Sequence, residues 1–249
     1  MSAPVLETRG LAKSFGGVQA VAGVDLAMPR GEIRALIGPN GAGKTTFFNM
    51  LTGQLKADAG EVRFKGERIS GLRPHAVWRR GVSRTFQITA TFSSLTALEN
   101  VQVALFSHGR RTYSLLGRAA RLDVDAARAL LDQVGLAAQA GRVAGVLAYG
   151  DLKKLELAVA LANKPEVLLL DEPTAGMAPA ERGALMALTE GIARERGLTV
   201  LFTEHDMDVV FSVADRIMVL HQGRVIAEGR PDEVRADPQV QKVYLGEAE

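Results

Sequence analysis

The 249-residue sequence contains no cysteine, and none of its apolar runs is long enough to form a membrane-spanning helix. Without cysteine, neither disulfide bonds nor thiolate metal sites hold the fold together, which agrees with a reducing compartment. A helix that crosses a bilayer needs about 20 predominantly apolar residues. The opening stretch MSAPVLETRG also lacks the basic and then apolar pattern of a secretory signal peptide. These absences favour a cytoplasmic protein.

A strong net charge is absent as well. The chain has 30 basic and 28 acidic residues, a formal net charge of +2, which is too small to favour binding to nucleic acid. A local excess of positive charge lies in GRRTYSLLGRAAR, which contains Arg110, Arg111, Arg118 and Arg121. We interpret this stretch as a solvated helix face and loop, in preference to a contact with lipid headgroups or a partner.

Patterns typical of strands occur in both halves of the sequence, and a helical pattern separates them. The strand patterns are VLETR, VDLAM, EIRALIG, GEVRFKGERI (one half-exposed strand), GVSRTFQ, EVLLLDEP, LTVLFTE and the hairpin RIMVLHQGRVIAEG. Between about Leu95 and Asn163 apolar residues recur at helical spacing, and a further helix is expected from Pro179 to Arg196. The uninterrupted runs VLLL and TVLF favour parallel strands buried on both faces. This order predicts an α/β fold with a helical insert.

The strongest motif is GPNGAGKTT, which matches the phosphate-loop pattern and lies between a strand pattern and a helical one. Its glycines allow backbone N–H groups to turn inward around a polyphosphate. Lys44 supplies a positive charge to the β and γ oxygens, and Thr45 offers a hydroxyl ligand to Mg²⁺. The following helix directs its positive end at the anion. The candidate ATP-binding residues here are Gly38, Pro39, Asn40, Gly41, Ala42, Gly43, Lys44, Thr45 and Thr46.

Two adjacent acids end the apolar strand pattern EVLLLDEP. A phosphate loop requires a carboxylate near the metal, and Asp171 is the candidate Mg²⁺ ligand. Two acids at the end of a buried strand are costly unless they have a function, so Glu172 is the candidate general base for an attacking water molecule.

Together these motifs resemble those of the ATP-binding cassette (ABC) ATPases, the motor subunits of ABC transporters, over nearly the whole chain. The resemblance implies a P-loop NTPase (RecA-like) core with an antiparallel β subdomain and an α-helical insert. It implies a single domain over 1–249, in which 1–87 and 164–249 form the core with the β subdomain and 88–163 forms the helical subdomain. It further implies that Phe15 stacks on adenine, that Gln87 senses the γ-phosphate and the metal while contacting a membrane partner, and that His205 holds the γ-phosphate and the water.

The same resemblance explains LAYGD, which precedes a helical pattern about twenty residues before the acidic strand. In the family this place is held by a signature resembling LSGGQ, which completes the ATP site of a second subunit through backbone N–H groups and a helix dipole. The candidate signature residues are Leu147, Ala148, Tyr149, Gly150 and Asp151. Asp151, a departure from the usual glutamine, could cap the helix, and Lys153 or Lys154 could screen its charge. Ala178, where the family usually has aspartate or asparagine, is a second departure.

The resemblance implies a catalytic cycle and a set of partners. Two cassettes would enclose two Mg·ATP molecules, hydrolyse ATP through Glu172 and His205, and reopen. Gln87 and the insert would transmit closure to a membrane permease, whose short cytoplasmic helix docks in a groove beside them. The chain would lie peripherally at the cytoplasmic face of the inner membrane and serve a solute-binding protein indirectly. RTFQ, LAYG, EHDM and the tail VQKVYLGEAE look like the ATPase of a branched-chain amino-acid importer, or of a related importer of amides and hydrophobic amino acids.

Two alternatives remain open from the sequence. One is an ABC ATPase of another class, such as a lipopolysaccharide-export motor or a cassette protein of translation or DNA repair. The other is a phosphate-loop kinase or GTPase outside the ABC family, although the chain has no obvious NKxD motif for reading guanine.

Overall fold

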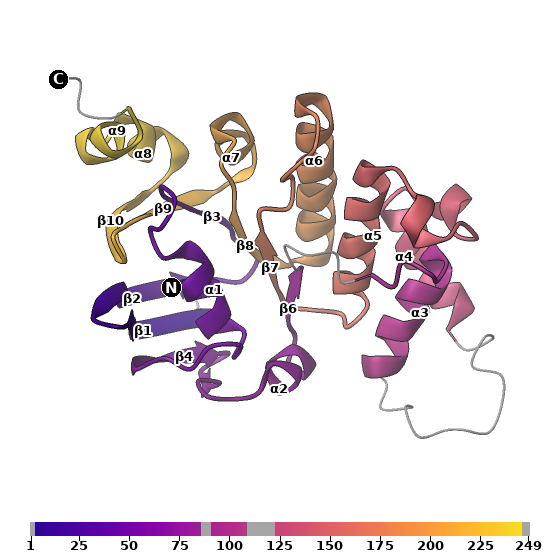
Figure 1. Ribbon diagram of the computed structural model, residues 1–249, viewed down its shortest axis with the longest axis horizontal. Helices are drawn as coiled ribbons and strands as arrows, with labels where there is room; N and C mark the ends of the chain where they lie inside the picture. The colour runs from indigo at the N-terminus through magenta and orange to yellow at the C-terminus, as the bar shows by residue number, and fades with distance from the viewer. Residues whose placement is uncertain (1–2, 86–90, 109–122, 246–249) are drawn as a thin grey trace.

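A computed structural model of the chain describes residues 3–85, 91–108 and 123–245 and contains two β-sheets with helices around them (Figure 1). Gln87 and the four arginines of GRRTYSLLGRAAR lie outside these residues. The strands are β1 Leu6–Phe15, β2 Val18–Met28, β3 Ile33–Ile37, β4 Ala59–Phe64, β5 Glu67–Arg68, β6 Val82–Thr85, β7 Val167–Asp171, β8 Thr199–Thr203, β9 Arg216–His221 and β10 Arg224–Gly229. None of the described helices combines the length and apolar character needed to cross a bilayer.

The helices fall into groups on either side of the larger sheet and at its two ends (Figure 1). They are α1 Lys44–Leu51, α2 Pro74–Arg79, α3 Ala97–His108, α4 Val124–Gln133, α5 Tyr149–Leu161, α6 Pro179–Arg196, α7 Met207–Val213, α8 Pro231–Ala236 and α9 Pro238–Leu245. The bounds of α6 confirm the helix expected there, and Pro179 stands in its first turn, where a missing N–H costs nothing. Helices α3, α4 and α5 contact one another and form the expected helical insert.

The smaller sheet is antiparallel, with strand order β2-β1-β4-β5. The prediction of one half-exposed strand over GEVRFKGERI is wrong, because the segment forms the hairpin of β4 and β5. Lys65 and Gly66 make the turn between them, with φ angles of 53° and 80°. Apolar and polar residues alternate only as far as Lys65, and the four residues without an apolar side chain from Lys65 to Arg68 mark the turn that the one-strand interpretation overlooks.

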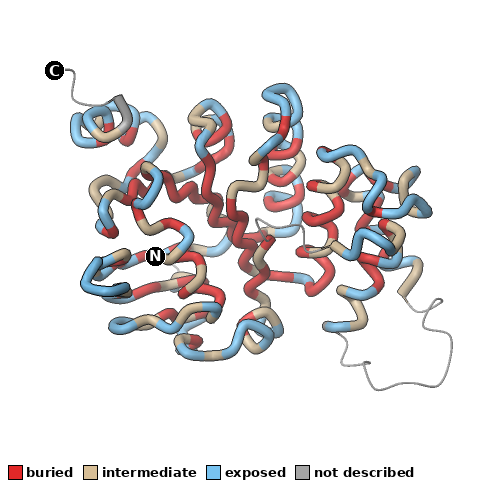
Figure 2. Tube along the Cα trace, in the orientation of Figure 1, coloured by how far each residue is buried: buried red, intermediate tan, exposed pale blue. Residues whose placement is uncertain are grey.

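The larger sheet has the strand order β10-β9-β3-β8-β7-β6 and is parallel except for β10. Its central strands β3, β7 and β8 are buried along their whole length, as the uninterrupted apolar runs predicted (Figure 2). Successive side chains point to opposite faces. In β7, for example, Leu168 and Leu170 join the core beneath the helical insert and α6, whereas Val167 and Leu169 join the core beneath α1 and the smaller sheet.

This strand order brings three functional segments together. In a parallel sheet, ligands bind outside the carboxyl ends of the strands. β8 lies between β3 and β7, so the segments that follow these three strands meet at one edge. They are the phosphate loop after β3, the acidic pair at the end of β7, and the segment with His205 after β8.

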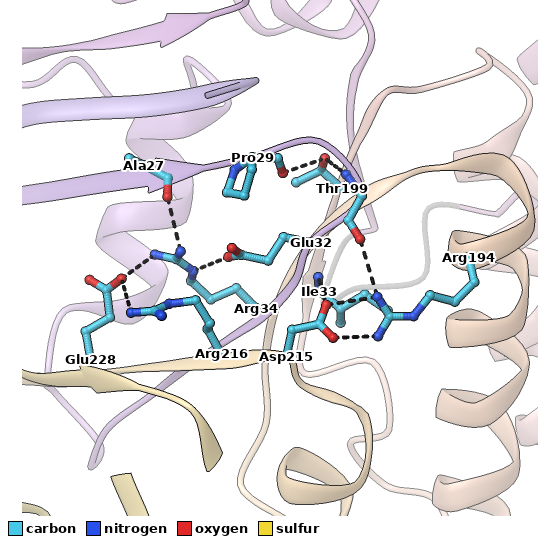
Figure 3. A network of polar contacts seen from close by, with 11 residues as sticks. Ala27, Pro29, Glu32, Ile33, Arg34, Arg194, Thr199, Asp215, Arg216 and Glu228 are labelled. Atoms are coloured by element: carbon cyan, nitrogen blue, oxygen red, sulfur yellow. Dashed lines mark hydrogen bonds and ion pairs between the residues drawn. The ribbon is translucent and has the colours of Figure 1, made fainter. Parts of the chain in front are cut away.

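A network of ion pairs joins the strands at the opposite, amino-terminal side of this sheet (Figure 3). The guanidinium of Arg34, which is only 2% exposed, donates to Glu32 at 2.5 Å and to Glu228 at 2.9 Å. Nearby, Arg194 of α6 donates to both oxygens of Asp215 at 2.9 and 2.7 Å, and Asp215 also accepts the backbone N–H of Ile33 at 2.8 Å. These bonds fix α6 and β9 to the start of β3.

Asp215 should contribute pH-dependent stability. Burial alone would raise its pKa, but the hydrogen bonds and charge of Arg194 and the N–H of Ile33 outweigh burial and hold the pKa below its usual value. A carboxylate whose pKa is lowered by folding stabilises the protein above its unfolded pKa of about 3.9, and that contribution is lost as the pH falls through the folded pKa. The free energy of unfolding of Asp215→Asn, measured by urea denaturation, should therefore be lower than that of the wild type at neutral pH and converge with it below about pH 4.

Glu190→Gln is the matched control, because Glu190 is exposed to a similar extent as Asp215, 34% against 38%, and contacts the same Arg194, but only through one long bond of 3.4 Å. A surface ion pair of this kind contributes about 0–1 kcal/mol. The free energies of unfolding of Glu190→Gln and the wild type should therefore differ little at every pH. A difference for Asp215→Asn that persists unchanged at pH 2 would contradict the assignment.

Candidate functional site

The phosphate loop connects the end of β3 to α1, and its glycines satisfy constraints of the backbone as well as of a ligand. Gly41 and Gly43 have φ angles of 79° and 105°, which residues with a side chain rarely adopt. At Gly43 a Cβ would also lie 2.2 Å from the carbonyl oxygen of Ala20, and at Gly38 it would lie 2.1 Å from that of Leu220. The fold therefore requires glycine at 38 and 43 for its own packing.

Lys44, the first residue of α1, is buried in this loop. Its Nζ atom donates to the carbonyl oxygens of Gly38 at 2.6 Å and Pro39 at 3.2 Å. Burial lowers the pKa of Lys44, and the negative charges of Glu172 and Asp171 oppose that shift. The lysine thus lies between its own loop and the two acids.

A pocket of about 200 Å³ opens at the loop. Residues of the loop from Asn40 to Thr46 line it, and Glu172 faces them. The sequence-predicted phosphate loop and the sequence-predicted general base are therefore in one cavity, although Thr46 and Glu172 are 126 positions apart in the sequence.

Asp171 is buried at the end of β7, and both of its carboxylate oxygens accept hydrogen bonds. Oδ1 accepts from the hydroxyl of Thr203 at 2.8 Å, and Oδ2 accepts from Arg84 at 2.7 Å. Among the described residues, no group of three or more His, Asp or Glu side chains could hold a metal by itself. Mg²⁺ commonly takes one or two protein carboxylates together with substrate phosphates and water, so Asp171 and Thr45 fit a metal that arrives with a nucleotide.

Glu172 and His205 face each other across the carboxyl edge of the sheet. The Nε2 atom of His205 lies 3.0 Å from Oε1 of Glu172. The backbone of Glu172 has a φ of 49°, an uncommon conformation that costs about 1–3 kcal/mol and is often found at functional sites. Its N–H donates to both the hydroxyl and the carbonyl of Thr203, at 2.9 and 3.2 Å. Thr203 therefore orients both acids.

Glu204, which follows Thr203 in the chain, fixes the loop that follows β7. The carboxylate of Glu204 is buried and accepts from the N–H and the hydroxyl of Thr174, at 2.9 and 2.6 Å. Charge-assisted bonds of this kind are about twice as strong as neutral ones. These bonds connect the segment that contains Glu172 to the segment that contains His205.

The signature candidates lie at the start of α5, away from the phosphate-loop pocket, which none of the residues 147–151 lines. The N-cap of α5 is Ala148, so Asp151 lies in the first turn and does not cap the helix as expected. Its carboxylate pairs with Lys154 at 3.1 Å, which provides the expected screening; Lys153 bonds instead to Glu156 at 3.2 Å. The Tyr149 hydroxyl donates to the carbonyl of Ala175 at 2.9 Å, joining this segment to the loop that contains Ala178.

Two further candidates have other placements. Phe15 ends β1, is half exposed, and has Nζ of Lys13 at 5.5 Å from its ring centroid. It does not line the phosphate-loop pocket, although Ala20 of the next strand does. Gln87 lies outside the described residues.

Sequence reasoning missed three residues that shape the site: Arg84, Thr203 and Glu204. Arg84 carried a usable signal, because an arginine within the short strand pattern GVSRTFQ is unusual unless it is paired. Thr203 and Glu204 follow the apolar run of LTVLFTE, just as Asp171 and Glu172 follow the apolar run of EVLLLDEP. This similarity could have identified them.

The fold and this site define a P-loop NTPase: a parallel sheet with a phosphate loop after one strand and paired acids at the end of another.

Comparisons with known proteins agree. Residues 21–175 match the protein family described as ABC transporter, and residues 224–249 match the family described as branched-chain amino acid ATP-binding cassette transporter. The chain is 44% identical to the high-affinity branched-chain amino acid transport ATP-binding protein BraF of Pseudomonas aeruginosa, and 42% identical to LivG of Escherichia coli, which has the same description. Each match covers 100% of both chains.

Solved structures show the same likeness. A nucleotide-free ATP-binding cassette from an ABC transporter has a TM-score of 0.86 and 32% identity, and covers 98% of this chain and 100% of its own. The ADP conformation of an ATP-binding cassette has a TM-score of 0.87 and 32% identity, with coverage of 99% and 100%. The chain belongs to the ABC transporter family, which confirms the resemblance stated from its motifs.

Proposed function

We propose that this protein is the ATP-hydrolysing subunit of an importer of branched-chain amino acids or related hydrophobic amino acids and amides. The observation that carries the proposal is the pocket in which the phosphate loop faces Glu172, with His205 in contact with that glutamate. The choice of cargo is supported by the full-length similarity to BraF and LivG, whose descriptions name branched-chain amino acid transport.

In the proposed site, ATP binds with its phosphates against the N–H groups of residues 38–46 and the start of α1. Lys44 exchanges its bonds to the loop carbonyls for bonds to phosphate oxygens, which carry more negative charge. Thr45 and Asp171 would hold Mg²⁺, with Gln87 as the third candidate. Mg²⁺ held by these residues would supply positive charge to offset the negative charge that develops on the phosphate oxygens. Phe15 is proposed to stack on adenine.

Glu172 is proposed as the general base. Its carboxylate accepts a proton from water while the water oxygen bonds to the γ-phosphorus and the bond from the γ-phosphorus to the bridging oxygen breaks, so that ADP leaves. Positioning supplies most of the remaining rate enhancement. His205 keeps the glutamate in place through their 3.0 Å contact and is proposed to hold the γ-phosphate as well.

We further propose that two cassettes close on two nucleotides. Residues 147–151 do not reach the phosphate-loop pocket of their own chain, which suits a role in the site of a second subunit, identical or paralogous. The Lys154 ion pair offsets the charge of Asp151, so the departure from glutamine should weaken closure less than an unpaired carboxylate would. The domain division stays as proposed: 1–87 and 164–249 as core with β subdomain, 88–163 as helical subdomain.

A groove of about 330 Å³ supports the proposed membrane partner. It lies between α2 and β6 on one side and α3 and α5 on the other, and its apolar wall includes Val77, Trp78, Val82, Ala104, Val159 and Ala160. We propose that a short cytoplasmic helix of the permease docks here, which places the protein peripherally on the cytoplasmic face of the inner membrane. A solute-binding protein would act through the permease.

The proposal is tested by calorimetry and reconstitution. The purified protein should bind Mg·ATP, and Lys44→Ala should weaken binding about 10- to 100-fold, the equivalent of one or two charge-assisted bonds. Reconstituted with its permease, the protein should hydrolyse ATP faster when leucine, isoleucine or valine is supplied with the solute-binding protein. Lack of Mg·ATP binding in folded wild-type protein would refute the ATPase assignment, and stimulation by an unrelated solute alone would refute the cargo.

A further inference from the structure

One arginine joins the groove to the acid that is proposed to bind the metal. Arg84 of β6 is 7% exposed, and its Nη2 atom donates to Oδ2 of Asp171, whose side chain is 2% exposed, at 2.7 Å. Its Nη1 atom donates to Oδ1 of Asn49 at 2.6 Å and to Oε1 of Gln54 at 3.0 Å. The guanidinium also lies 5.7 Å from the ring centroid of Phe48. A single side chain thus contacts α1, the loop after it, and β7.

These contacts fix the rotamer of Asp171. A carboxylate attached to a strand end can rotate, and its two oxygens are held here by two donors from different strands, Thr203 on one side and Arg84 on the other. Each oxygen has a second lone-pair direction beyond the donor it accepts from. The two bonds therefore orient the carboxylate while leaving it able to accept from a metal-bound water or to ligate a metal.

Arg84 also lines the groove between α2, β6, α3 and α5, together with Glu156 and Trp78. The arginine is therefore shared by two proposed sites: the docking groove for the permease and the Mg·ATP site. Because Arg84 lines the groove, a group that fills the groove would contact the residue whose guanidinium holds Asp171. A long, planar, bidentate side chain suits such a connection because its ends can bond in different directions while remaining one rigid unit.

We propose that Arg84 is a positioning residue: it orients Asp171 for Mg²⁺, and it makes that orientation depend on what occupies the groove. The inference rests on the proposed function and deepens it by identifying how the partner's docking reaches the nucleotide. Removing a group that orients a metal ligand typically lowers metal affinity about 10- to 100-fold. Loss of Arg84 should therefore raise the Mg²⁺ concentration that nucleotide binding requires, and should leave metal-free nucleotide binding unchanged.

The first test uses Arg84→Met, which keeps the length and packing of the side chain without its donors. Binding of a fluorescent ATP analogue to the whole protein is measured at fixed nucleotide over a range of Mg²⁺ concentrations, and again in EDTA. The half-saturating Mg²⁺ concentration should rise about 10-fold, whereas metal-free binding should match that of the wild type. Arg84→Lys, which retains one charged donor but not the fork, should give an intermediate rise and guards against failure of the first variant to fold.

Arg34→Met is the matched control. Arg34 is a similarly buried arginine in a carboxylate network, with 2% of its side chain exposed (Figure 3). It lies on β3, which β8 and β7 separate from β6, and it pairs with Glu32 and Glu228 and not with Asp171. Its loss should lower stability without changing the Mg²⁺ curve. An Arg84 variant with the wild-type Mg²⁺ curve would overturn the proposal, as would one that loses metal-free and metal-dependent binding equally. A lower Mg²⁺ requirement would also overturn it, because Arg84 would then compete with the metal.

The second readout tests the connection to the groove. In proteoliposomes with the permease, the ratio of stimulated to basal hydrolysis at saturating Mg²⁺ should fall several-fold in Arg84→Met and stay at the wild-type value in Arg34→Met. An unchanged ratio in Arg84→Met would refute the connection. If the wild type itself showed no Mg²⁺-dependent nucleotide binding, the proposed function would fail, which is a different result from that of a wild-type-like variant.

Discussion

Replacing Glu172 with glutamine is expected to lower steady-state ATP hydrolysis by about 100- to 10,000-fold, the usual contribution of a general base. Glutamine has nearly the same shape, can adopt the same backbone conformation, and can still bond to His205. It cannot accept a proton from water. Binding of Mg·ATP should therefore persist, and turnover is measured as phosphate release under saturating Mg·ATP.

The same variant should accumulate as a closed dimer when ATP is present, because closure is proposed to require binding and reopening to require hydrolysis. Size-exclusion chromatography with light scattering distinguishes the two states. Glu166→Gln is the control, since Glu166 precedes β7 as Glu172 follows it, carries the same charge, and pairs at the surface with Lys65 at 2.8 Å. Normal turnover in Glu172→Gln would falsify the general-base assignment.

The sequence was sufficient to predict the elements of the core but not their order in the sheet. Local patterns located β3, β7, β8 and α6, because uninterrupted apolar runs and a proline in the first turn are local signals. The position of β8 between β3 and β7 depends on contacts distant in the sequence. That order is what brings Glu172 and His205 within 3.0 Å of each other, so the motifs indicated the residues and only the fold could place them together.

The errors and omissions also have physical causes. The one-strand interpretation of β4 and β5 fails because it extends the alternation of Val62 and Phe64 across Lys65 and Gly66, which form a turn. The capping role expected of Asp151 fails because the sequence places a helix boundary only to within a residue or more. Arg84 does not belong to a recognised motif, unlike Gln87 three residues later. The significance of Arg84 depends on Asp171 and Asn49, which lie 87 and 35 residues away in the sequence and meet it only in the folded chain.

The phosphate loop supports a second prediction of large effect. It distinguishes a glycine that is required for stability of the fold from one that is required for nucleotide binding. Gly43→Ala should destabilise the protein by about 2–5 kcal/mol, the sum of a strained φ and an overpacked contact. The new Cβ would lie 2.2 Å from the carbonyl oxygen of Ala20, and that neighbour is backbone, which cannot move aside as a side chain can. Because Gly43 stands at the N-terminus of α1, the shift should also displace the N–H groups that are proposed to bind the phosphates. Urea denaturation and ATP titration measure the two effects.

Gly41→Ala is the comparison that makes this prediction decisive. Gly41 also has a positive φ, 79°, but a Cβ there meets nothing within 4 Å, so the cost in stability should be only about 1–2 kcal/mol. If the two variants were equally stable, the contact with Ala20 would be unimportant, and glycine at 43 would be required by the ligand alone. A larger loss for Gly43→Ala would mean that the smaller sheet shapes the nucleotide site, since Ala20 belongs to β2. The antiparallel sheet would then set the position of the loop before any nucleotide arrives.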